Sequence, residues 1–150
     1  MRFDLSKEFN IVHSDTLKSG EERLFVDKND ILKVLTFLKN VPECGFDMLK
    51  TISCAQFGDV FELSYYLYSS SAKDYVVITV NISSNDEAID SVSSVFGSAN
   101  WDEREIYDMF GVRFNNHPNL KRILMPDEWK GHPLRKDYVN DDKRLRWNYE

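Results

Sequence analysis

The feature that most constrains this chain is the loss of any regular hydrophobic pattern after Gly111. Before that glycine, apolar residues recur at strand or helix spacing, whereas beyond it three prolines follow at intervals of eight and seven residues, beginning at Pro118. Proline cannot donate a backbone hydrogen bond and disrupts helix and sheet interiors, so no long regular element can run through this region. The sequence therefore predicts a compact body over residues 1–111 and an extended, irregular C-terminal arm over residues 112–150.

Within the body, segments rich in β-branched and aromatic residues alternate with polar turns. Strands are expected at residues 9–13 and 22–26, and three more runs within residues 46–82 should form an antiparallel meander. Residues 27–42 carry apolar side chains at helical spacing and end on a proline, which predicts an amphipathic helix. Residues 86–96 are weakly helical in pattern. This order predicts an α+β fold, an antiparallel sheet with flanking helices.

The composition is typical of a globular protein, with 42% hydrophobic and 13% aromatic residues in a chain of 150. The first 110 residues carry 10 basic and 19 acidic side chains, and the remaining forty carry 9 and 6. A net charge of +3 on the arm is far short of a nucleic-acid-binding stripe, which favours an acidic protein partner or the chain's own body. Cys44 and Cys54 lack a metal-binding spacing and are interpreted as buried thiols. The longest apolar run is too short to cross a bilayer, so a soluble or peripheral protein is expected.

Residues 100–111 contain the parts of a short helix that ends the body. Asn100 is a candidate N-cap, and Glu103 three residues later would complete a capping box. Gly111 suits a left-handed C-terminal cap, because glycine adopts that conformation without steric cost. A helix is therefore expected to lead directly into the arm.

One face of this helix is charged and admits two interpretations. Helical spacing places four residues on this face: Trp101, Arg104, Glu105 and Asp108. Glu105 and Asp108 could form a carboxylate pair for acid–base catalysis. Alternatively, Arg104 neutralises both acids in a salt-bridge network that Trp101 covers at a contact. A neighbouring arginine lowers carboxyl pKa values and works against a general acid, which favours the second interpretation.

The arm holds two histidines and several large apolar side chains. His117 and His132 each precede a proline and have no third ligand at a customary interval, so both are interpreted as hydrogen-bonding corners and not as metal ligands. Aromatic residues such as Trp129 and Tyr138 would be an aggregation hazard in water. The arm is therefore expected to lie along a surface, either its own body or a partner.

An ordered series of motifs near the C-terminus resembles a known family. The series runs as "ERE" from Glu103, "DMFG" ending at Gly111, "HP" at His117, "LKRIL" around Arg122 and "GHPLRKDY" ending at Tyr138. It closely resembles the C subunit of proton-pumping NADH:quinone oxidoreductase, respiratory complex I, also called the 30 kDa subunit family. The earlier chain is similar to that family's body more loosely, so the resemblance spans nearly the whole length.

The resemblance implies a non-catalytic structural subunit of the peripheral arm of that complex. Such a subunit supports the quinone-pocket subunit, also called the D subunit, while electrons pass from NADH through FMN and iron–sulfur centres to quinone with coupled proton translocation. No cofactor is expected in this chain, since FMN and the clusters belong to other subunits. The C-terminal arm should lie along the quinone-pocket subunit and adjoin the terminal iron–sulfur subunits. The complex would hold the chain at the cytoplasmic side of the inner membrane, or its organelle equivalent, without nucleic acid.

The residues expected at this interface combine charged, aromatic and turn-forming side chains from the last helix and the arm. They are Trp101, Glu103, Arg104, Glu105, Asp108, Gly111, His117, Pro118, Arg122, Trp129, His132, Pro133, Arg135, Lys136, Asp137 and Tyr138. Two alternatives stay open. One is the equivalent subunit of a related membrane-bound hydrogenase or deazaflavin-dependent dehydrogenase. The other, from a different class, is a stand-alone hydrolase that uses Glu105 and Asp108.

Overall fold

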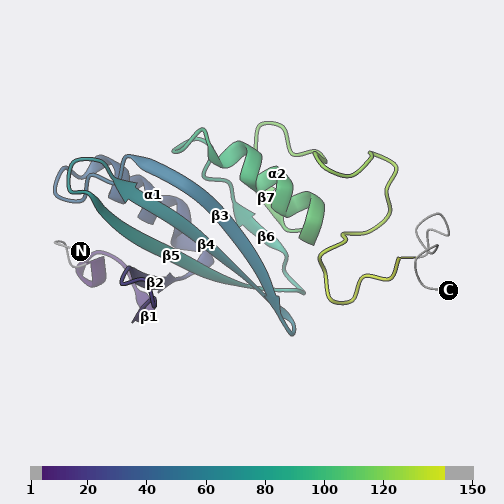
Figure 1. Ribbon diagram of the computed structural model, residues 1–150, viewed down its shortest axis with the longest axis horizontal. Coiled ribbons are helices and arrows are strands. Elements are labelled where there is room, and N and C mark those ends of the chain that lie inside the picture. The colour runs from purple at the N-terminus through teal and green to yellow at the C-terminus, as the bar shows by residue number, and fades with distance from the viewer. Residues whose placement is uncertain (1–4, 141–150) are drawn as a thin grey trace.

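The computed structural model describes residues 5–140, which form a five-stranded sheet, a helix across one of its faces and a second small layer at one end (Figure 1). In chain order the elements are η1 (Leu5–Lys7), β1 (Ile11–Thr16), β2 (Glu22–Val26), η2 (Lys28–Asp30), α1 (Ile31–Asn40), β3 (Met48–Phe57), β4 (Val60–Ser69), β5 (Asp74–Ser83), β6 (Ala88–Asp90), α2 (Ala99–Phe110) and β7 (Arg113–Asn115). The predicted α+β class is confirmed.

The sheet has the strand order β1-β2-β5-β4-β3. The predicted meander β3–β4–β5 is confirmed, and Gly58 turns its first hairpin with a φ of 58° between the paired residues Phe57 and Val60. Three of the four pairings are antiparallel, but β2 runs parallel to β5, so the sheet is mixed and not purely antiparallel. The parallel pairing arises because α1 leads the chain to the far edge strand β3, from which the meander returns to place the central strand β5 beside β2.

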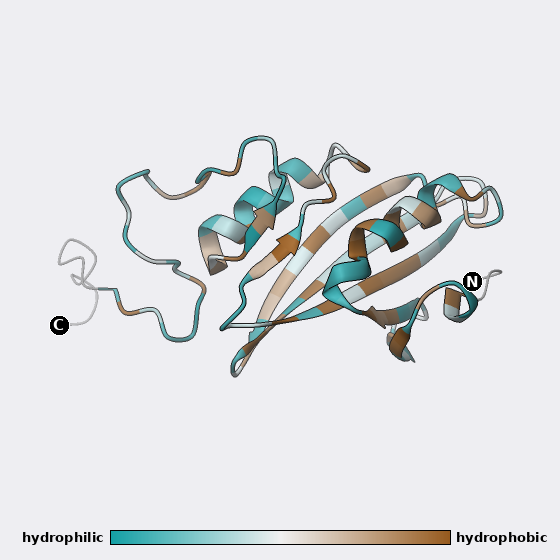
Figure 2. Cartoon of the chain, turned by 180° about the vertical axis from the view of Figure 1, so that it is seen from behind, coloured by the Kyte–Doolittle hydropathy of each residue, from teal (hydrophilic) through white to brown (hydrophobic). Residues whose placement is uncertain are grey.

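The helix α1 covers one face of the sheet with a continuous apolar stripe (Figure 2). Ile31, Val34, Leu35 and Leu38 are all 0% exposed, and their spacing of three and four residues puts them on one side of the helix. Burial of each such side chain contributes about 1.5–3 kcal/mol before conformational entropy is subtracted. The amphipathic helix predicted for this region is confirmed, and its apolar stripe forms the centre of the core.

The helical pattern of residues 86–96 is misleading, because this segment contains β6 and turns. β6 pairs in parallel with β7 and brings Ile89 beside Phe114, which are 2% and 3% exposed. Strands of three residues are too short to produce a recognisable alternation, which explains the wrong prediction. The core consequently continues past Gly111, since Val112 and Phe114 both belong to it.

After β7 the described chain contains no further helix or strand as far as Asn140. It continues as the extended, irregular arm that the prolines predict and leads away from the body beyond α2 (Figure 1). Within residues 5–140, no helix combines the length and the apolar character needed to span a bilayer.

Candidate interface site

The helix α2 lies beside the edge strand β3 and carries the charged residues singled out in the sequence. Its first turn is fixed to β3 because the N–H of Ile52 donates to Asp102 at 2.8 Å. The predicted capping box is wrong: Ser98 occupies the N-cap position, and Asn100 already lies inside the helix. Gly111 ends the helix in the left-handed conformation, with φ 84°, as its position predicts.

Asp108 is 0% exposed and is the point at which the arm is attached to α2. Arg122 donates to its Oδ1 at 2.6 Å. The Oδ2 atom accepts from the backbone N–H groups of Ile123, Leu124 and Met125 at 3.0, 2.8 and 2.9 Å. Burial acts to raise the pKa of Asp108, but the hydrogen bonds from Met125, Arg122, Ile123 and Leu124 outweigh it and hold the pKa below its usual range. Asp108 is therefore an anion whose oxygens are all occupied.

Arg122 extends this attachment to the next turn of the arm. Its Nη2 donates to the carbonyl groups of Trp129 and Gly131 at 3.0 and 2.9 Å. The Trp129 indole N–H in turn donates to the Tyr138 hydroxyl at 3.1 Å. One guanidinium therefore joins the helix, the start of the arm and its middle, which suits the several fixed donors of arginine.

Arg104 has a different role from the predicted one. Its Nε and Nη2 donate to the backbone carbonyls of Lys121 and Arg122, both at 3.1 Å, and its guanidinium lies 5.1 Å from the Trp101 ring centre. The predicted network of Arg104 with Glu105 and Asp108 is wrong, because the arm crosses α2 and supplies both the carbonyl acceptors and the competing cation. Glu105 is exposed.

Glu103 is the second fully buried carboxyl group of α2, one turn before Asp108. It is bonded to the Ser91 hydroxyl at 2.6 Å and accepts from the N–H of Val92 at 2.7 Å. Burial raises the pKa of Glu103 to about 7, in spite of the hydrogen bonds from Ser91 and Val92, and the negative charge of Asp102 adds to the rise. The pKa values of two carboxyl groups on one helix are thus shifted in opposite directions, upward for Glu103 and downward for Asp108.

Both histidines of the arm form hydrogen-bonded corners. His117 Nδ1 accepts from the N–H of Asn119 at 3.0 Å, and its Nε2 lies 3.2 Å from the carbonyl of Asn100. His132 Nδ1 lies 2.9 Å from the carbonyl of Asp108. These contacts join the arm to the beginning and the end of α2.

The last attachment is formed by Arg135. It donates to Glu87 at 2.5 Å and to Asp137 at 2.9 Å, and the hydrogen bonds with Asp137 and Glu87 raise its pKa. One residue later, the N–H of Lys136 donates to Gln56 at 2.8 Å. The arm is thus bonded to α2, to the segment before β6 and to the edge strand β3.

The expected interface residues therefore separate into those that hold the arm and those that face solvent. Exposed members are Trp101, Glu105, Pro118, Lys136 and Asp137, while Pro133 is half-buried. Sequence reasoning missed four partners of these residues. Ser91 and Val92 are hydrogen-bonded to Glu103, Glu87 accepts from Arg135, and Gln56 accepts from the N–H of Lys136. No local signal marks these partners, since each lies more than ten residues from the group that it bonds.

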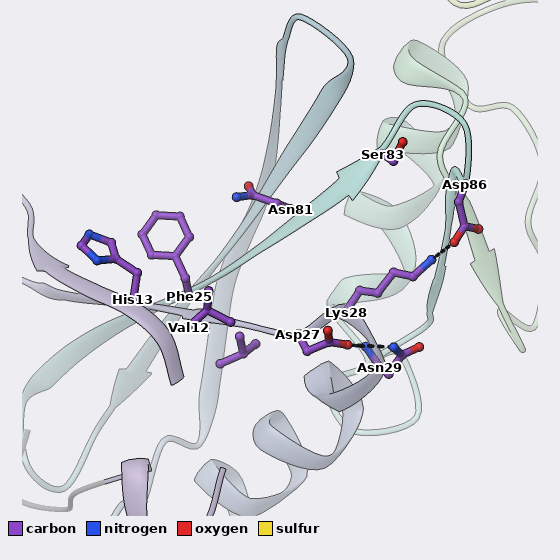
Figure 3. A pocket seen from close by; sticks show the side chains of 10 residues that line it. Val12, His13, Phe25, Asp27, Lys28, Asn29, Asn81, Ser83 and Asp86 are labelled. Carbon is purple, nitrogen blue, oxygen red and sulfur yellow. Dashed lines mark hydrogen bonds and ion pairs between the residues drawn. The ribbon is translucent and has the colours of Figure 1, made fainter. Parts of the chain in front are cut away.

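A pocket of about 510 Å³ lies between β1, β2, β5 and the turn before α1 (Figure 3). It is lined by Val12, His13, Phe25, Val26, Asp27, Lys28, Asn29, Asn81, Ser83 and Asp86, none of which is an expected site residue. Lys28 is paired with Asp86, and Asp27 accepts from the N–H of Asn29. The pocket brings no nucleophile and base together, and Asp108 has no free oxygen, so the geometry gives no support to a hydrolase.

Metal binding by this chain likewise finds no support in its described part. Across residues 5–140, no group of three or more histidine, cysteine or acidic side chains is placed to hold a metal ion. Cys44 is buried, and burial raises the pKa of the partly buried Cys54 to about 12. Burial thus favours the neutral thiol form of Cys54.

The fold and the site together define a small α+β module whose buried polar groups bond an irregular C-terminal arm to its last helix. The chain belongs to the family described as respiratory-chain NADH dehydrogenase, 30 Kd subunit, whose model matches residues 24–144. The family resemblance predicted from the arm motifs is thereby confirmed.

Curated relatives agree with this assignment. The chain is 46% identical over 123 residues to the C subunit of NADH-quinone oxidoreductase from Trichlorobacter lovleyi, an alignment that covers 79% of this chain and 75% of the relative. It is 40% identical over 126 residues to the C/D subunit of NADH-quinone oxidoreductase from Buchnera aphidicola, an alignment that covers 77% of this chain but only 22% of that longer protein. The name of the second relative joins the C and D subunits in one polypeptide.

Two solved structures share the fold. A trypsin-resistant fragment of Nqo5 superposes with a TM-score of 0.65 at 23% identity and covers 77% of this chain and 92% of the fragment. A chain of an archaeal membrane-bound sulfane sulfur reductase superposes with a TM-score of 0.79 at 19% identity and covers 97% of this chain and 86% of its own length. At these identities the likeness concerns the fold alone.

Proposed function

We propose that this chain is a structural subunit of an NADH:quinone oxidoreductase, in which it supports the quinone-pocket subunit in the peripheral arm of the complex. The observation that carries the proposal is the 46% identity to a C subunit of this enzyme over 75% of that relative's length. Electron transfer from NADH to quinone, coupled to proton translocation, is the activity of the whole complex. FMN and the iron–sulfur clusters belong to other subunits, and this chain contributes none of them.

The quinone-pocket subunit is the partner on which the arm docks. The relatives whose names join the C and D subunits support this pairing, since two parts of one polypeptide must lie within reach of each other. The exposed apolar side chains also favour it: Trp101, Leu124, Leu134 and Val139 are 61%, 62%, 55% and 79% exposed. Burial of such residues against a partner provides much of the stability of an interface. The terminal iron–sulfur subunits are further neighbours, and the complex holds the chain at the cytoplasmic face of the membrane or its organelle equivalent.

The network around Asp108 performs the structural task within this chain. It holds the arm in one conformation before the partner arrives, and this lowers the entropy that binding must overcome. Arg122 matters most, because it is the only one of the described side chains that donates to a carboxylate oxygen of Asp108 and also to two carbonyls of the arm. The charged residues of α2 thus orient the arm and take no part in chemistry.

An equivalent role in another respiratory complex is less favoured. The sulfane sulfur reductase chain has the same fold at 19% identity, whereas the identities to the C subunits of NADH-quinone oxidoreductase reach 46%. The fold is therefore compatible with several electron-transfer complexes, and the higher identity selects NADH:quinone oxidoreductase among them.

Assembly and turnover can be separated in cells that carry Arg122→Ala, with the exposed Arg113→Ala as the matched control. Native gels should show less intact complex for Arg122→Ala, while NADH:quinone activity per assembled particle stays near normal. Arg113→Ala should assemble normally. Normal assembly of Arg122→Ala with abolished turnover would contradict a structural role, because the residue would then take part in the reaction.

A further inference from the structure

The two buried carboxyl groups of α2 are stabilised in different ways, and the difference defines a second site. Asp108 has the cation of Arg122 and three N–H donors. Glu103 is also 0% exposed, but within residues 5–140 its hydrogen bonds come only from the neutral Ser91 hydroxyl and the Val92 N–H. A buried carboxylate without a cation is costly, whereas a protonated carboxylic acid is not.

The nearest basic group cannot supply the missing charge. The Nε2 atom of His117 lies 3.7 Å from Glu103, and both side chains are fully buried. The Nδ1 atom of the same ring accepts the N–H of Asn119, so the ring proton resides on Nε2, where the Asn100 carbonyl accepts it. The contacts of both ring nitrogens are thus made to backbone groups, and the ring forms no hydrogen bond with Glu103.

The other titratable groups described around Glu103 are Asp102 and Tyr65, and neither is a cationic side chain. Asp102 precedes it on α2, and its charge acts to raise the pKa of Glu103. Tyr65 on β4 is fully buried, its hydroxyl lacks a hydrogen-bond partner among the described residues, and burial, Glu103 and Cys54 all act to raise its pKa.

Two serine hydroxyls connect the buried acid with the surface. Ser91 Oγ lies 2.6 Å from Glu103 and 2.7 Å from the hydroxyl of the partly exposed Ser93. A protonated Glu103 can donate to Ser91, which in turn donates to Ser93. On ionisation the carboxyl proton leaves through this pair to solvent water, and Ser91 reverses to donate to the carboxylate.

We propose that Glu103 is a proton-binding site that keeps its proton well above the usual range of a glutamate, and that loss of this proton loosens the junction where the arm leaves the body. The junction is affected because the site joins three segments: the residues after β6 through Ser91, α2 itself, and the first turn of the arm through His117. A new negative charge at this point is buried between all three.

The direction of the pH dependence follows from the two protonation equilibria. The folded state holds the proton up to a pKa of about 7, whereas the usual pKa of a glutamate is 4.5. Stability from this group is therefore full below pH 4.5 and is lost as pH rises through 7. Each pKa unit by which the folded and unfolded states differ changes the folding equilibrium constant by a factor of ten. The ratio of folded to unfolded protein should therefore fall on the order of 100-fold across this pH range, relative to a variant that does not titrate at this position.

The test is a pH titration of the full-length wild-type chain by carbon-13 NMR of the assigned Glu103 carboxyl. A midpoint near 7 is expected, and a midpoint near 4.5, the usual value of a glutamate, would overturn the proposal. This measurement needs no variant, so a folding defect in Glu103→Gln cannot leave it undecided.

Two further readouts test the coupling to the arm. Denaturant unfolding should show that wild-type stability decreases relative to Glu103→Gln between about pH 5 and pH 8. In the same pH interval, amide exchange of Asn119 should accelerate in the wild type relative to the variant, while the Leu134 amide, bonded to Met109 away from the cluster, should not. Equal exchange at Asn119 in both proteins would show that the proton does not govern the junction.

Discussion

The body and the arm of this protein are held by different forces. In the body, side chains such as Phe61 and Leu35 are 0% exposed and belong to one continuous apolar core. Between Asn115 and Asn140 no residue is fully buried, although the side chain of His117 is. The arm is instead fixed by hydrogen bonds to α2, above all those of Asp108 and Arg122.

This difference separates the stabilisation of the body from the orientation of the arm. Apolar burial is non-directional and large, and it stabilises the body. Hydrogen bonds are directional and individually modest, so they can orient the arm without using its apolar side chains. Leu124 and Leu134 consequently remain exposed and available to a partner.

The largest effect is expected from a core truncation in the body. Phe61→Ala removes a fully buried ring from β4 and should lower the free energy of unfolding by about 3–5 kcal/mol. Phe57→Ala, at a position that is 60% exposed in the adjacent hairpin, is the matched control and should stay within about 0.5 kcal/mol. Chemical denaturation measures both, and similar losses would remove the basis for treating the core as the stabilising element.

A smaller and more local effect is expected from Asp108→Ala. The substitution leaves Arg122 and three backbone N–H groups without their acceptor, which should cost about 3 kcal/mol, mainly in the docking of the arm. Amide exchange of Ile123, Leu124 and Met125 should rise far more than that of the core strands. Glu105→Ala, at an exposed position on the same helix, is the control. Uniform loss of protection throughout the chain would show that the arm and body unfold as one unit.

Gly111→Ala tests the corner where the body meets the arm. The φ of 84° costs a non-glycine residue about 1–2 kcal/mol, and an added Cβ would lie 2.7 Å from Cδ2 of His132. Gly97→Ala is the control, since its Cβ would meet nothing within 4 Å and its φ lies outside the left-handed region. Thermal melting should separate the two variants, and an unchanged melting temperature for Gly111→Ala would contradict the described corner.

The smallest effect is expected from acidification, which acts on the attachment of the arm through Asp108 and leaves it unchanged near neutral pH. Because the folded-state pKa of Asp108 is lowered, its stabilisation is present above the usual aspartate pKa of 3.8 and is lost as pH falls below it. The arm amides bonded to Asp108 should therefore lose protection in acid before the core does. The opposite direction is expected for Glu103, so a single pH series distinguishes the two carboxyl groups. Arm protection that stays unchanged in acid until the core itself unfolds would contradict an ionised anchor.

Much of the body could be predicted from local pattern, whereas the interior of the site could not. The apolar spacing of α1, the meander and the cap at Gly111 are all properties of a few neighbouring residues. The strand β6 was missed because three residues carry too little periodicity. The pairing of Asp108 with Arg122 and of Glu103 with Ser91 depends on contacts made across 14 and 12 positions, which spacing alone does not determine. Helical periodicity grouped Arg104, Glu105 and Asp108, but Glu105 is exposed and the cation at Asp108 is Arg122, because the path of the arm across α2 is a tertiary feature.

The central claim is that the arm binds the partner while the body folds independently of it. Native gels test partner binding in cells that carry the double variant Leu124→Asp, Leu134→Asp, and melting of the isolated chain tests its folding. The comparison is Val12→Asp on the edge strand β1, where the side chain is 66% exposed. The isolated chains should melt like the wild type in both cases, because all three positions are exposed. We expect the complex to be lost only for the arm variant. Wild-type levels of complex in that variant, or equal loss in the β1 variant, would contradict a docking role for the arm.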